Sequence, residues 1–426
     1  NAGLATHLGP SGKTCSEDPA GCMSYGLVGQ WDMDEGSGSI LNDKSGNNNS
    51  CSLVNGPVWS KGKTGSALYF DGENDYADCN TAANDMSSVV GTVELWAKAD
   101  RGIGFPFHSN ANIRTYLYRG ASGFSVSKGD PMVSINFPNT PIGEWHHLVL
   151  TWDAGVFWGY QDGVLIDSKS FSGTATATIV GIGRHASGGS SDYYDGDVDG
   201  VKIYNRALSE EEVRYHYNQG KPVGYWAMDE GEGTRAFDVS GNNNTGVLTN
   251  GPTWVEGKHG SALSFDGVDD YVGCGTDSSL NIADSMTASA WIYPKTLGEG
   301  SAGHIVGRGG TSGWCLYVYT GNSLKLYAGT IQAVSSANSI TLNQWQYATV
   351  VYDKQNVRFF VNGVEKGVTA ATSSIVNTGS CVIGARTTAG DFDFNGYLDE
   401  VKVYNYARTA EQIMQDYNAG VATHLK

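Results

Sequence analysis

Apolar and polar residues alternate with a period of two along much of the chain. Clear examples are residues 67–70 (ALYF), 92–99 (TVELWAKA), 146–152 (HHLVLTW) and 200–205 (GVKIYN). Gly, Asn and Asp separate these segments, so the pattern predicts short strands joined by turns. A helix is expected near residues 209–220, because Ser209 is a favoured N-cap residue, acidic residues follow it, and Gly220 can end the segment.

The same pattern occurs twice in the chain. Residues 31–79 and 226–274 align without a gap, and later segments repeat at a slightly larger offset. A second helix is expected to end at Gly420. We therefore predict an all-β fold of two tandem antiparallel β-sandwiches, each closed by one short C-terminal helix. The predicted parts are an arm and linker (1–25), a first domain (26–220) and a second domain with a C-terminal tail (221–426).

Composition and charge limit the fold class and the kinds of binding partner that the chain can have. The chain has 426 residues, of which 58 are Gly and only 17% are charged. This composition favours strands and turns over helices. The net charge of −17 disfavours a nucleic-acid partner, and no apolar run is long enough to predict a membrane span.

Seven cysteines occur without a CxxC pair or a zinc-like Cys/His cluster. We expect a local disulfide between Cys15 and Cys22, and one disulfide in each half of the chain, Cys51–Cys79 and Cys315–Cys381. Cys274 is then left as a buried free thiol. Sequence alone does not determine this connectivity, but disulfides would fit an exported protein.

Several longer motifs recur in both copies. They are VGxWxMDEGxG, DxSGNNN, NGPxW, GSALxFDGxxDY and, near the end, [VL]DxVK[IV]YN. Together they resemble the laminin-G-like family of concanavalin-A-like jelly rolls in its bacterial secreted form. The resemblance implies a jelly-roll fold in an extracellular or cell-surface repeat protein. It implies less about activity, because this fold serves lectins, adhesion modules and glucanases alike.

A catalytic site is not expected. Related glucanases carry Glu-x-Asp-x-x-Glu on one strand, and the nearest match here is ENDYAD, from Glu73 to Asp78. The second copy reads VDDYVG there and keeps only one of the three carboxylates. We also find no Ser/His/Asp elbow and no phosphate-binding loop. The prediction is a non-catalytic protein with no catalytic residues.

Calcium is the expected cofactor, in a structural role. The segments DKSGNNN and DVSGNNN place oxygen side chains at alternating positions from Asp43 and Asp238, as in a calcium loop or in an Asx-rich turn. The family resemblance implies an ion held by the aspartate of the late motif, Asp199 or Asp399. Asp34 and Asp229 are expected to end the first strand of each copy, and both copies keep this aspartate. We predict one Ca²⁺ per domain, with ligands among Asp34, Asp43, Asp199, Asp229, Asp238 and Asp399.

Aromatic side chains that differ between the copies are the candidate ligand-binding residues. Tryptophans that recur in both copies are expected in the core, whereas a binding surface can diverge. The first copy offers Trp158, Tyr160, Tyr193 and Tyr194, with Arg184. The second copy offers Trp314, Tyr319 and Arg386.

The chain opens with NAGLATHLG and closes with NAGVATHLK. This echo suggests one repeat of a larger array, or self-association in which the N-terminal arm docks where the C-terminal tail does. The main hypothesis is a lectin-like binding and adhesion module that grips a glycan or a surface protein. The alternatives are a subunit of an extracellular filament joined head to tail, and an accessory carbohydrate-binding module of a polysaccharide-degrading enzyme.

Overall fold

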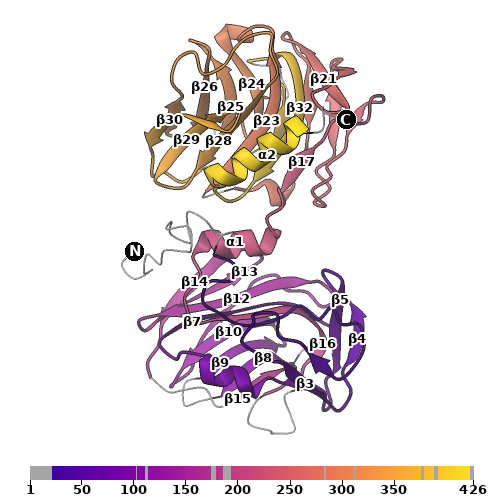
Figure 1. The fold of residues 1–426 in the computed structure, drawn as a ribbon, viewed down its shortest axis with the longest axis vertical. Helices are drawn as coiled ribbons and strands as arrows, with labels where there is room; N and C mark the ends of the chain where they lie inside the picture. Colours follow the sequence, from indigo (N-terminus) through magenta and orange to yellow (C-terminus); the bar gives the residue numbers. More distant parts are fainter. Residues whose placement is uncertain are drawn as a thin grey trace. The chain divides into compact units, whose positions relative to one another are not determined.

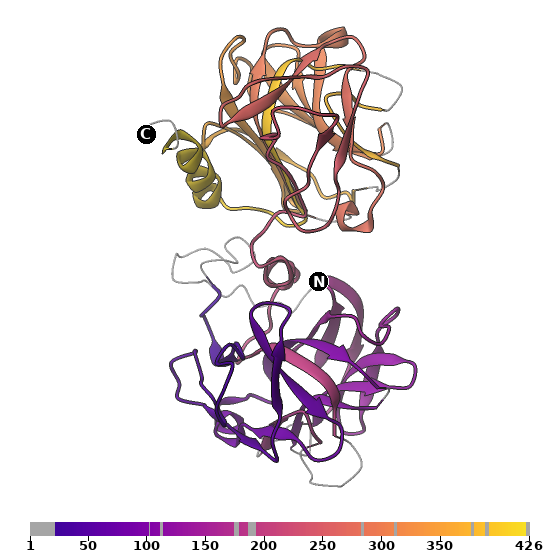
Figure 2. The same cartoon turned by 90° about the vertical axis from the view of Figure 1, so that its right-hand side faces the viewer.

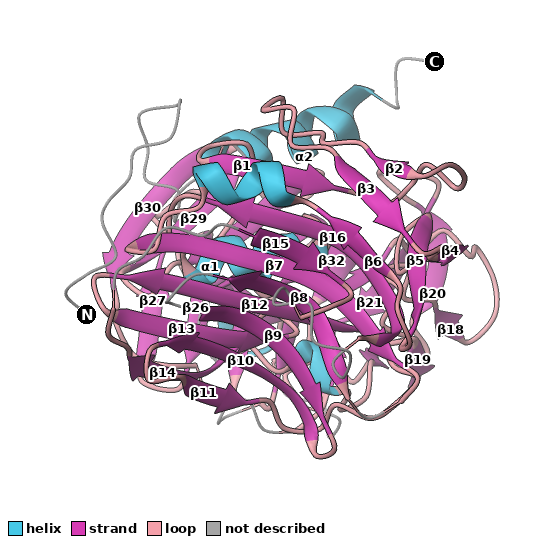
Figure 3. Ribbon diagram, turned by 90° about the horizontal axis from the view of Figure 1, so that it is seen from below, coloured by secondary structure: helices cyan, strands magenta, loops and turns pink. Residues whose placement is uncertain are grey.

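The computed structural model describes residues 22–101, 103–110, 114–173, 179–185, 193–282, 285–310, 313–375, 379–387 and 392–422. The chain divides into two compact units, Asn1–Gln219 and Gly220–Lys426, called domain 1 and domain 2 below. Each domain consists of two antiparallel sheets that face each other, as Figure 2 shows. Strands dominate both domains (Figure 3). The predicted all-β fold of two β-sandwiches, each followed by a helix, is confirmed.

We name the sheet that contains the long last strand of each domain sheet A, and the other sheet B. Sheet A of domain 1 runs in the order β14 (Val164–Ser170), β13 (Val156–Gln161), β12 (His146–Asp153), β7 (Val90–Ala99), β16 (Asp195–Tyr204), β5 (Ser66–Asp71) and β4 (Val58–Lys61), with β1 (Leu27–Trp31) paired to β16. Sheet B of domain 1 runs in the order β11 (Val133–Asn136), β10 (Gly123–Gly129), β9 (Arg114–Gly120), β8 (Gly104–Asn110), β15 (Ile179–Ile182), β6 (Tyr76–Asp78), β3 (Cys51–Val54) and β2 (Ile40–Leu41).

Domain 2 repeats this topology. Its sheet A runs in the order β20 (Thr253–Glu256), β21 (Ser261–Asp266), β32 (Asn395–Tyr404), β23 (Met286–Pro294), β28 (Gln346–Tyr352), β29 (Asn356–Val361) and β30 (Val364–Ala370), with β17 (Gly224–Trp226) paired to β32. Its sheet B runs in the order β18 (Arg235–Ala236), β19 (Gly246–Thr249), β22 (Tyr271–Gly273), β31 (Cys381–Ile383), β24 (Ala302–Arg308), β25 (Trp314–Tyr319), β26 (Ser323–Ala328) and β27 (Ile331–Val334).

The period-two pattern divides each strand between two faces. In β7, Val93, Leu95 and Ala97 enter the core between the sheets. Trp96 points to the opposite face of sheet A, where its ring stacks on Tyr217 of the helix at 5.5 Å between centroids. The central strand β7 is therefore buried on both faces, although only one face meets sheet B.

One helix covers the outer face of each sheet A, as Figure 1 shows for the longer helix α2. Helix α1 (Glu210–Asn218) starts at a capping box, in which Ser209 and Glu212 bond to each other's backbone amides. Helix α2 (Ala410–Ala422) continues past Gly420, so the predicted stop at that residue is wrong. A side chain at Gly420 would lie 2.7 Å from the Trp291 ring, so glycine there permits close packing on sheet A. Neither described helix is long and apolar enough to cross a membrane.

The cysteine predictions have mixed outcomes. Cys51 and Cys79 form a disulfide between β3 and β6, as predicted. Cys22 is disulfide-bonded, and its predicted partner Cys15 lies outside the described residues. The prediction of a Cys315–Cys381 disulfide is wrong, because both are free thiols. Cys381 faces the core, whereas Cys315 faces the outside of sheet B, so the two thiols lie on opposite sides of the sheet.

Candidate functional site

The outer face of sheet B in domain 2 carries a cluster of tyrosines. Along β25, Trp314, Leu316 and Val318 point into the core, and the residues between them point outward. Tyr317 and Tyr319 therefore share the outer face with Tyr327 of β26. A pocket of about 320 Å³ opens there, which we call the tyrosine pocket. Its lining consists of Gly300, Ala302, Tyr317, Tyr319, Lys325, Tyr327, Gln332, Arg386 and Phe392.

Two cations stand beside these rings. The Lys325 ammonium lies 4.6 Å from the centre of the Tyr319 ring and 3.4 Å from Gln332 Oε1. The Arg386 guanidinium lies 4.3 Å from the centre of the Phe392 ring. Among the described residues that line the pocket, none is acidic. The site therefore combines aromatic surface with positively charged hydrogen-bond donors.

Burial and the neighbouring Cys315 raise the pKa of the Tyr317 hydroxyl, which is also hydrogen-bonded to Arg386. The hydroxyl therefore stays protonated at neutral pH and can donate a hydrogen bond. The lining residues that the structure describes include no pair of carboxylates. The pocket is chemically suited to binding and positioning a polar ligand.

Domain 1 has a different set of rings on the same face. Phe105 lies 4.7 Å from Tyr118 between ring centroids, and His108 lies 4.4 Å from Tyr116 and 4.0 Å from His185. These five rings pack on one another. On the neighbouring strands, the paired residues Ser127 and Ser134 occupy the positions of the domain 2 pair Tyr327 and Gln332. The two domains therefore present different chemistry on one backbone.

Most of the aromatic residues predicted to bind a ligand do not line the tyrosine pocket, so that prediction is corrected. Tyr194 and Trp314 are fully buried in the cores. Trp158 and Tyr160 pack beneath α1. These side chains are occupied by packing and are not a stacking platform.

The two remaining domain 1 candidates are Arg184, just after the C-terminal end of β15, and Tyr193. Arg184 stacks on Tyr76 at 3.5 Å, and its backbone forms an isolated bridge with that of Tyr193. In domain 2, the structure brings Tyr319 and Arg386 together in one pocket.

Sequence reasoning missed Tyr317, Tyr327 and Lys325. The signal was present, because residues an even number of steps apart share one face of a strand. Trp314 and Tyr319 are five residues apart and so must point to opposite faces, whereas Tyr317 and Tyr319 share a face. Applying this parity to WCLYVY and SLKLYA would have found the cluster.

The predicted calcium ligands fall into two groups. Asp34 and Asp199 belong to the first, and both line a pocket of about 160 Å³ in domain 1, together with Asp32. Asp199 Oδ2 accepts a hydrogen bond from the Thr64 amide at 3.0 Å, and Asp34 Oδ1 accepts one from the Ser66 amide at 2.8 Å. One oxygen of each carboxylate is thus fixed in place by the backbone.

Asp229 and Asp399 are arranged in the same way in domain 2. Asp399 Oδ2 accepts from the His259 amide at 2.8 Å, and Asp229 Oδ1 accepts from the Ser261 amide at 3.2 Å. Asp399 Oδ1 is buried and has no hydrogen-bond partner within the described part of the chain. A buried carboxylate oxygen without a donor is a good ligand for a hard cation.

Both late aspartates are difficult to ionise in the absence of a cation. Burial raises the pKa of Asp199 to about 7, and the charge of Asp34 adds to this rise. Burial raises the pKa of Asp399 to about 8, with contributions from Glu400 and Asp229. A bound cation would compensate these buried charges, so the two pairs fit a calcium ion.

The second group, Asp43 and Asp238, favours the Asx-turn alternative. Asp43 accepts hydrogen bonds from the backbone amides of Gln30, Ser45 and Asn49 and from the Ser45 hydroxyl. Asp238 accepts the corresponding four bonds in domain 2. All their acceptor positions hold the turn to the first strand, so these carboxylates serve the loop itself.

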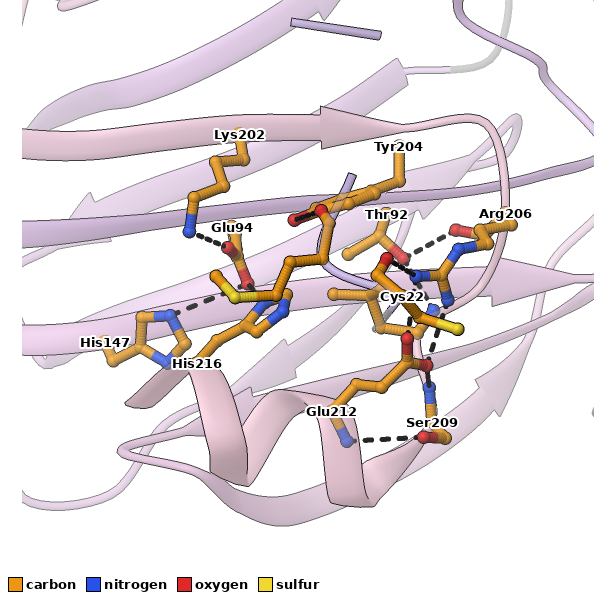
Figure 4. A network of polar contacts seen from close by, with 12 residues as sticks. Cys22, Thr92, Glu94, His147, Lys202, Tyr204, Arg206, Ser209, Glu212 and His216 are labelled. Atoms are coloured by element: carbon orange, nitrogen blue, oxygen red, sulfur yellow. Dashed lines mark hydrogen bonds and ion pairs between the residues drawn. The ribbon is translucent and has the colours of Figure 1, made fainter. Parts of the chain in front are cut away.

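A network of charged side chains lies under helix α1 (Figure 4). Its members Glu94, His147, Lys202 and His216 also line the Asp34–Asp199 pocket. Glu94 of β7 accepts a hydrogen bond from the Lys202 ammonium at 2.9 Å and is hydrogen-bonded to His216 Nδ1 at 2.8 Å. His147 Nε2 lies 3.8 Å from the same carboxylate. Burial opposes ionisation of Glu94, but the attraction of His216 and Lys202 outweighs it and holds its pKa well below its usual range. Burial lowers the pKa of His147 to about 4, so this ring is neutral at pH 7.

Comparison with known proteins gives a family and a fold. Residues 71–214 and 266–414, together more than half of the chain, match the family described as the concanavalin A-like lectin/glucanases superfamily. No curated protein matches the sequence.

Several solved structures are similar in fold. Domain 4 of AbnA, a GH43 extracellular arabinanase from Geobacillus stearothermophilus in complex with arabinotriose, is 20% identical with a TM-score of 0.36, covering 44% of this chain and 96% of that chain. Domains LG4-5 of the mouse laminin alpha1 chain are 10% identical with a TM-score of 0.27, covering 89% and 88%. The Ruminococcus gnavus IT-sialidase CBM40 bound to alpha2,3 sialyllactose is 14% identical with a TM-score of 0.31, covering 37% and 97%. At these identities and TM-scores, the likeness says nothing about ligands.

Proposed function

The chain belongs to the concanavalin A-like lectin/glucanases superfamily, and on this premise we propose that it is a non-catalytic, lectin-like protein whose domain 2 binds a saccharide in the tyrosine pocket. The observation that carries this proposal is the pocket itself. Three tyrosines and a phenylalanine surround about 320 Å³, and Lys325, Gln332 and Arg386 complete the wall. This volume is at the lower end of the range for small-molecule sites and suits one or two sugar rings.

The chemistry of the wall suits a sugar. Aromatic faces pack against the apolar C–H face of a pyranose or furanose ring, while amide and cationic donors bond to its hydroxyls. The two cations favour a saccharide that carries a carboxylate, because a bidentate Arg–carboxylate pair is stronger than a neutral hydrogen bond. This preference is local, since the chain as a whole has a net charge of −17.

We further propose that each domain binds one structural Ca²⁺, through Asp34 and Asp199 in domain 1 and Asp229 and Asp399 in domain 2. Carboxylate oxygens are the ligands that calcium prefers. The ion would neutralise the carboxylates. It would also hold the turn whose backbone amide donates to Asp199 or Asp399 against the end of sheet A. Asp32 gives domain 1 a further carboxylate, which domain 2 replaces with Ala227.

An extracellular, adhesive role is consistent with the disulfide Cys51–Cys79, because disulfides persist in oxidising compartments. We propose a glycan of a surface or matrix as the partner. The predicted self-association remains a prediction, because residues 1–8 and 423–426 lie outside the described residues.

A glycan array probed with the intact chain, followed by calorimetry on the strongest hits, tests the saccharide proposal. We expect binding to sugars that carry a carboxylate, and a loss of affinity of about tenfold or more when Tyr319→Ala removes one aromatic wall. Tyr271→Ala is the matched control, because Tyr271 is also half-buried on sheet B but lies outside the pocket. No binding on the array, or equal affinity for the Tyr319 and Tyr271 variants, would contradict the proposal.

Calorimetry in calcium and in chelator tests the metal. Calcium should raise the melting temperature of both domains, and Asp199→Asn should abolish the rise in domain 1 while leaving that of domain 2. Melting temperatures that do not respond to calcium in either domain would refute this part of the proposal.

A further inference from the structure

Two free cysteines of domain 2 face each other across neighbouring strands of sheet B. Strands β22 and β31 are antiparallel, and their register pairs Val272 with Ile383 and Gly273 with Val382. The next pair in this register is Cys274 and Cys381, and the Cys274 amide donates to the Cys381 carbonyl at 2.8 Å. Both side chains enter the same core, and the Cys381 thiol contributes to the raised pKa of the Cys274 thiol. Opposed cysteines on adjacent strands have the spacing that a disulfide needs.

Domain 1 has a disulfide at the corresponding place, formed with the neighbour on the other side. Cys79 occupies the position of Cys274, and its amide donates to Val180 as that of Cys274 does to Cys381. Cys79 is bonded to Cys51 of β3. In domain 2, Gly246 stands where Cys51 would be, and a side chain there would meet the Cys274 sulfur at 3.4 Å.

The two domains therefore place the second cysteine on opposite neighbours of the same strand. Domain 1 has cysteine on the β3 side and valine on the β15 side. Domain 2 has glycine on the β19 side and cysteine on the β31 side. In each domain a second cysteine, Cys51 or Cys381, faces the cysteine that both domains have at the same position, Cys79 or Cys274. Both domains can therefore form a cross-link at this position, although to different neighbouring strands.

We propose that Cys274 and Cys381 form a disulfide that joins β22 to β31 and is the domain 2 counterpart of Cys51–Cys79. The oxidant is a small disulfide of the glutathione class. The thiolate of one cysteine attacks a sulfur of this oxidant and releases one reduced thiol; the second cysteine thiolate then attacks the mixed disulfide and releases the other. Two protein thiols lose two electrons and two protons, and the oxidant is reduced to two thiols.

The bond forms while the strands are still accessible. Cys274 is 3% exposed and Cys381 is 0% exposed, so an oxidant does not reach either sulfur in the folded domain. Burial also raises the pKa of the Cys274 thiol, which makes it less reactive. Oxidation during refolding should cross-link the pair completely, whereas oxidation of the folded, reduced protein should be slow.

Peptide mapping tests this connectivity directly. Trypsin separates the three cysteines of domain 2 into peptides 259–295, 309–325 and 367–386. After refolding of the full chain with reduced and oxidised glutathione, alkylation and digestion without reductant, we expect peptides 259–295 and 367–386 to be joined. Peptide 309–325 should be alkylated at Cys315, whose side chain faces away from both partners.

The native bond Cys51–Cys79 is the internal control for oxidation. If it is formed while Cys274 and Cys381 are both alkylated, or if either is joined to Cys315, the proposal is wrong. The variants Cys274→Ala and Cys381→Ala give a second readout in the melting temperature of domain 2. Oxidation should raise this temperature by several degrees in the wild type and in Cys315→Ala, and should not raise it in the other two variants. If the variants do not fold, the wild-type peptide map still decides.

Discussion

The two domains fold to one topology but have different side chains at matched positions beneath their helices. In domain 1, Glu94 is paired with Lys202, His216 and His147. The strand register puts Ser289 at the Glu94 position and Tyr347 at the His147 position of domain 2.

Domain 2 has neutral groups at these two positions and pairs its charges elsewhere, with Asp416 of α2 bonded to Arg408 at 2.9 Å. The Tyr347 hydroxyl is 2.9 Å from Ser289 Oγ, and Lys402 turns to Glu400 at 2.7 Å. The apolar contacts of the helix with sheet A recur in both domains, with Val213 on α1 and Ile413 on α2. The helix therefore requires a packed and hydrogen-bonded interface, and it tolerates different placements of the charged groups within it.

The largest expected effect comes from removing the centre of the charged network. Glu94→Ala leaves the buried His216 and the partly buried Lys202 without their partner, and we expect domain 1 to lose about 3–5 kcal/mol of unfolding free energy. The matched change in domain 2, Ser289→Ala, removes one neutral hydrogen bond and should cost about 1 kcal/mol. Urea titration of each variant measures both losses, and equal losses would show that the charges do not distinguish the domains.

The disulfide gives the next largest effect. Replacing Cys51 and Cys79 together by alanine opens a cross-link between residues 28 apart and should destabilise domain 1 by about 3 kcal/mol. Cys315→Ala, which removes a buried free thiol of domain 2, is the control and should cost less. Calorimetry provides the measurement. An unchanged melting temperature of domain 1 in the double variant would mean that the disulfide contributes little to its stability.

The pH dependence of domain 1 has two opposed parts. Asp199, whose pKa burial raises to about 7, makes the folded state more stable as the pH falls, whereas His147 makes it less stable. The part that belongs to His147 follows from its own pKa. The folded-state pKa of about 4 lies below the usual value of about 6.5, so the unfolded chain takes up the proton first as the pH falls. The stability that His147 contributes is complete above pH 6.5 and is lost as the pH falls toward 4. Between pH 7.5 and pH 5 this loss is about 2 kcal/mol.

His147→Tyr copies domain 2 and should remove this part of the pH dependence of domain 1. Domain 2 is the internal control, because burial lowers the pKa of its own His304 to about 3 and this residue is unchanged. Unfolding measured at the two pH values decides the matter. An unchanged difference for domain 1 would assign its pH dependence to other groups.

The smallest expected effect is the difference in stability lost when the N-cap of α1 or of α2 is removed. Ser209→Ala removes a capping box whose Glu212 also holds Arg206, whereas Thr409→Ala removes a cap completed by the neutral Gln412. We expect about 1–2 kcal/mol for the first and about 1 kcal/mol for the second. Thermal unfolding of each variant measures the costs, and a larger cost at Thr409 would reverse the comparison.

The sequence predicted the fold well because its evidence is local and occurs twice. Alternation along segments such as 92–99 assigned strands, and the repeat assigned two copies of one sandwich. The start of the helix at Ser209 followed from cap chemistry. The disulfide Cys51–Cys79 followed from the placement of both cysteines in strands of one half.

The candidate site was predicted only in part. Tyr319 and Arg386 lie in one pocket, but Trp314 is in the core and Trp158 is beneath α1. Comparing copies identified residues that differ, yet a difference does not tell whether a side chain faces solvent, the core or a helix. The parity of positions within β25 carried that information and would have excluded Trp314.

The sequence by itself determined the elements of this protein, their order and the duplication, since backbone pattern and turn chemistry act over a few residues. Only the tertiary structure decided which distant side chains meet. Cys381 faces Cys274 instead of Cys315, and Glu94 meets His216 of the helix, because strand register and helix docking bring together residues that are more than one hundred positions apart. Such contacts depend on which strands are neighbours and on which face of the sheet each side chain occupies. Local composition determines neither.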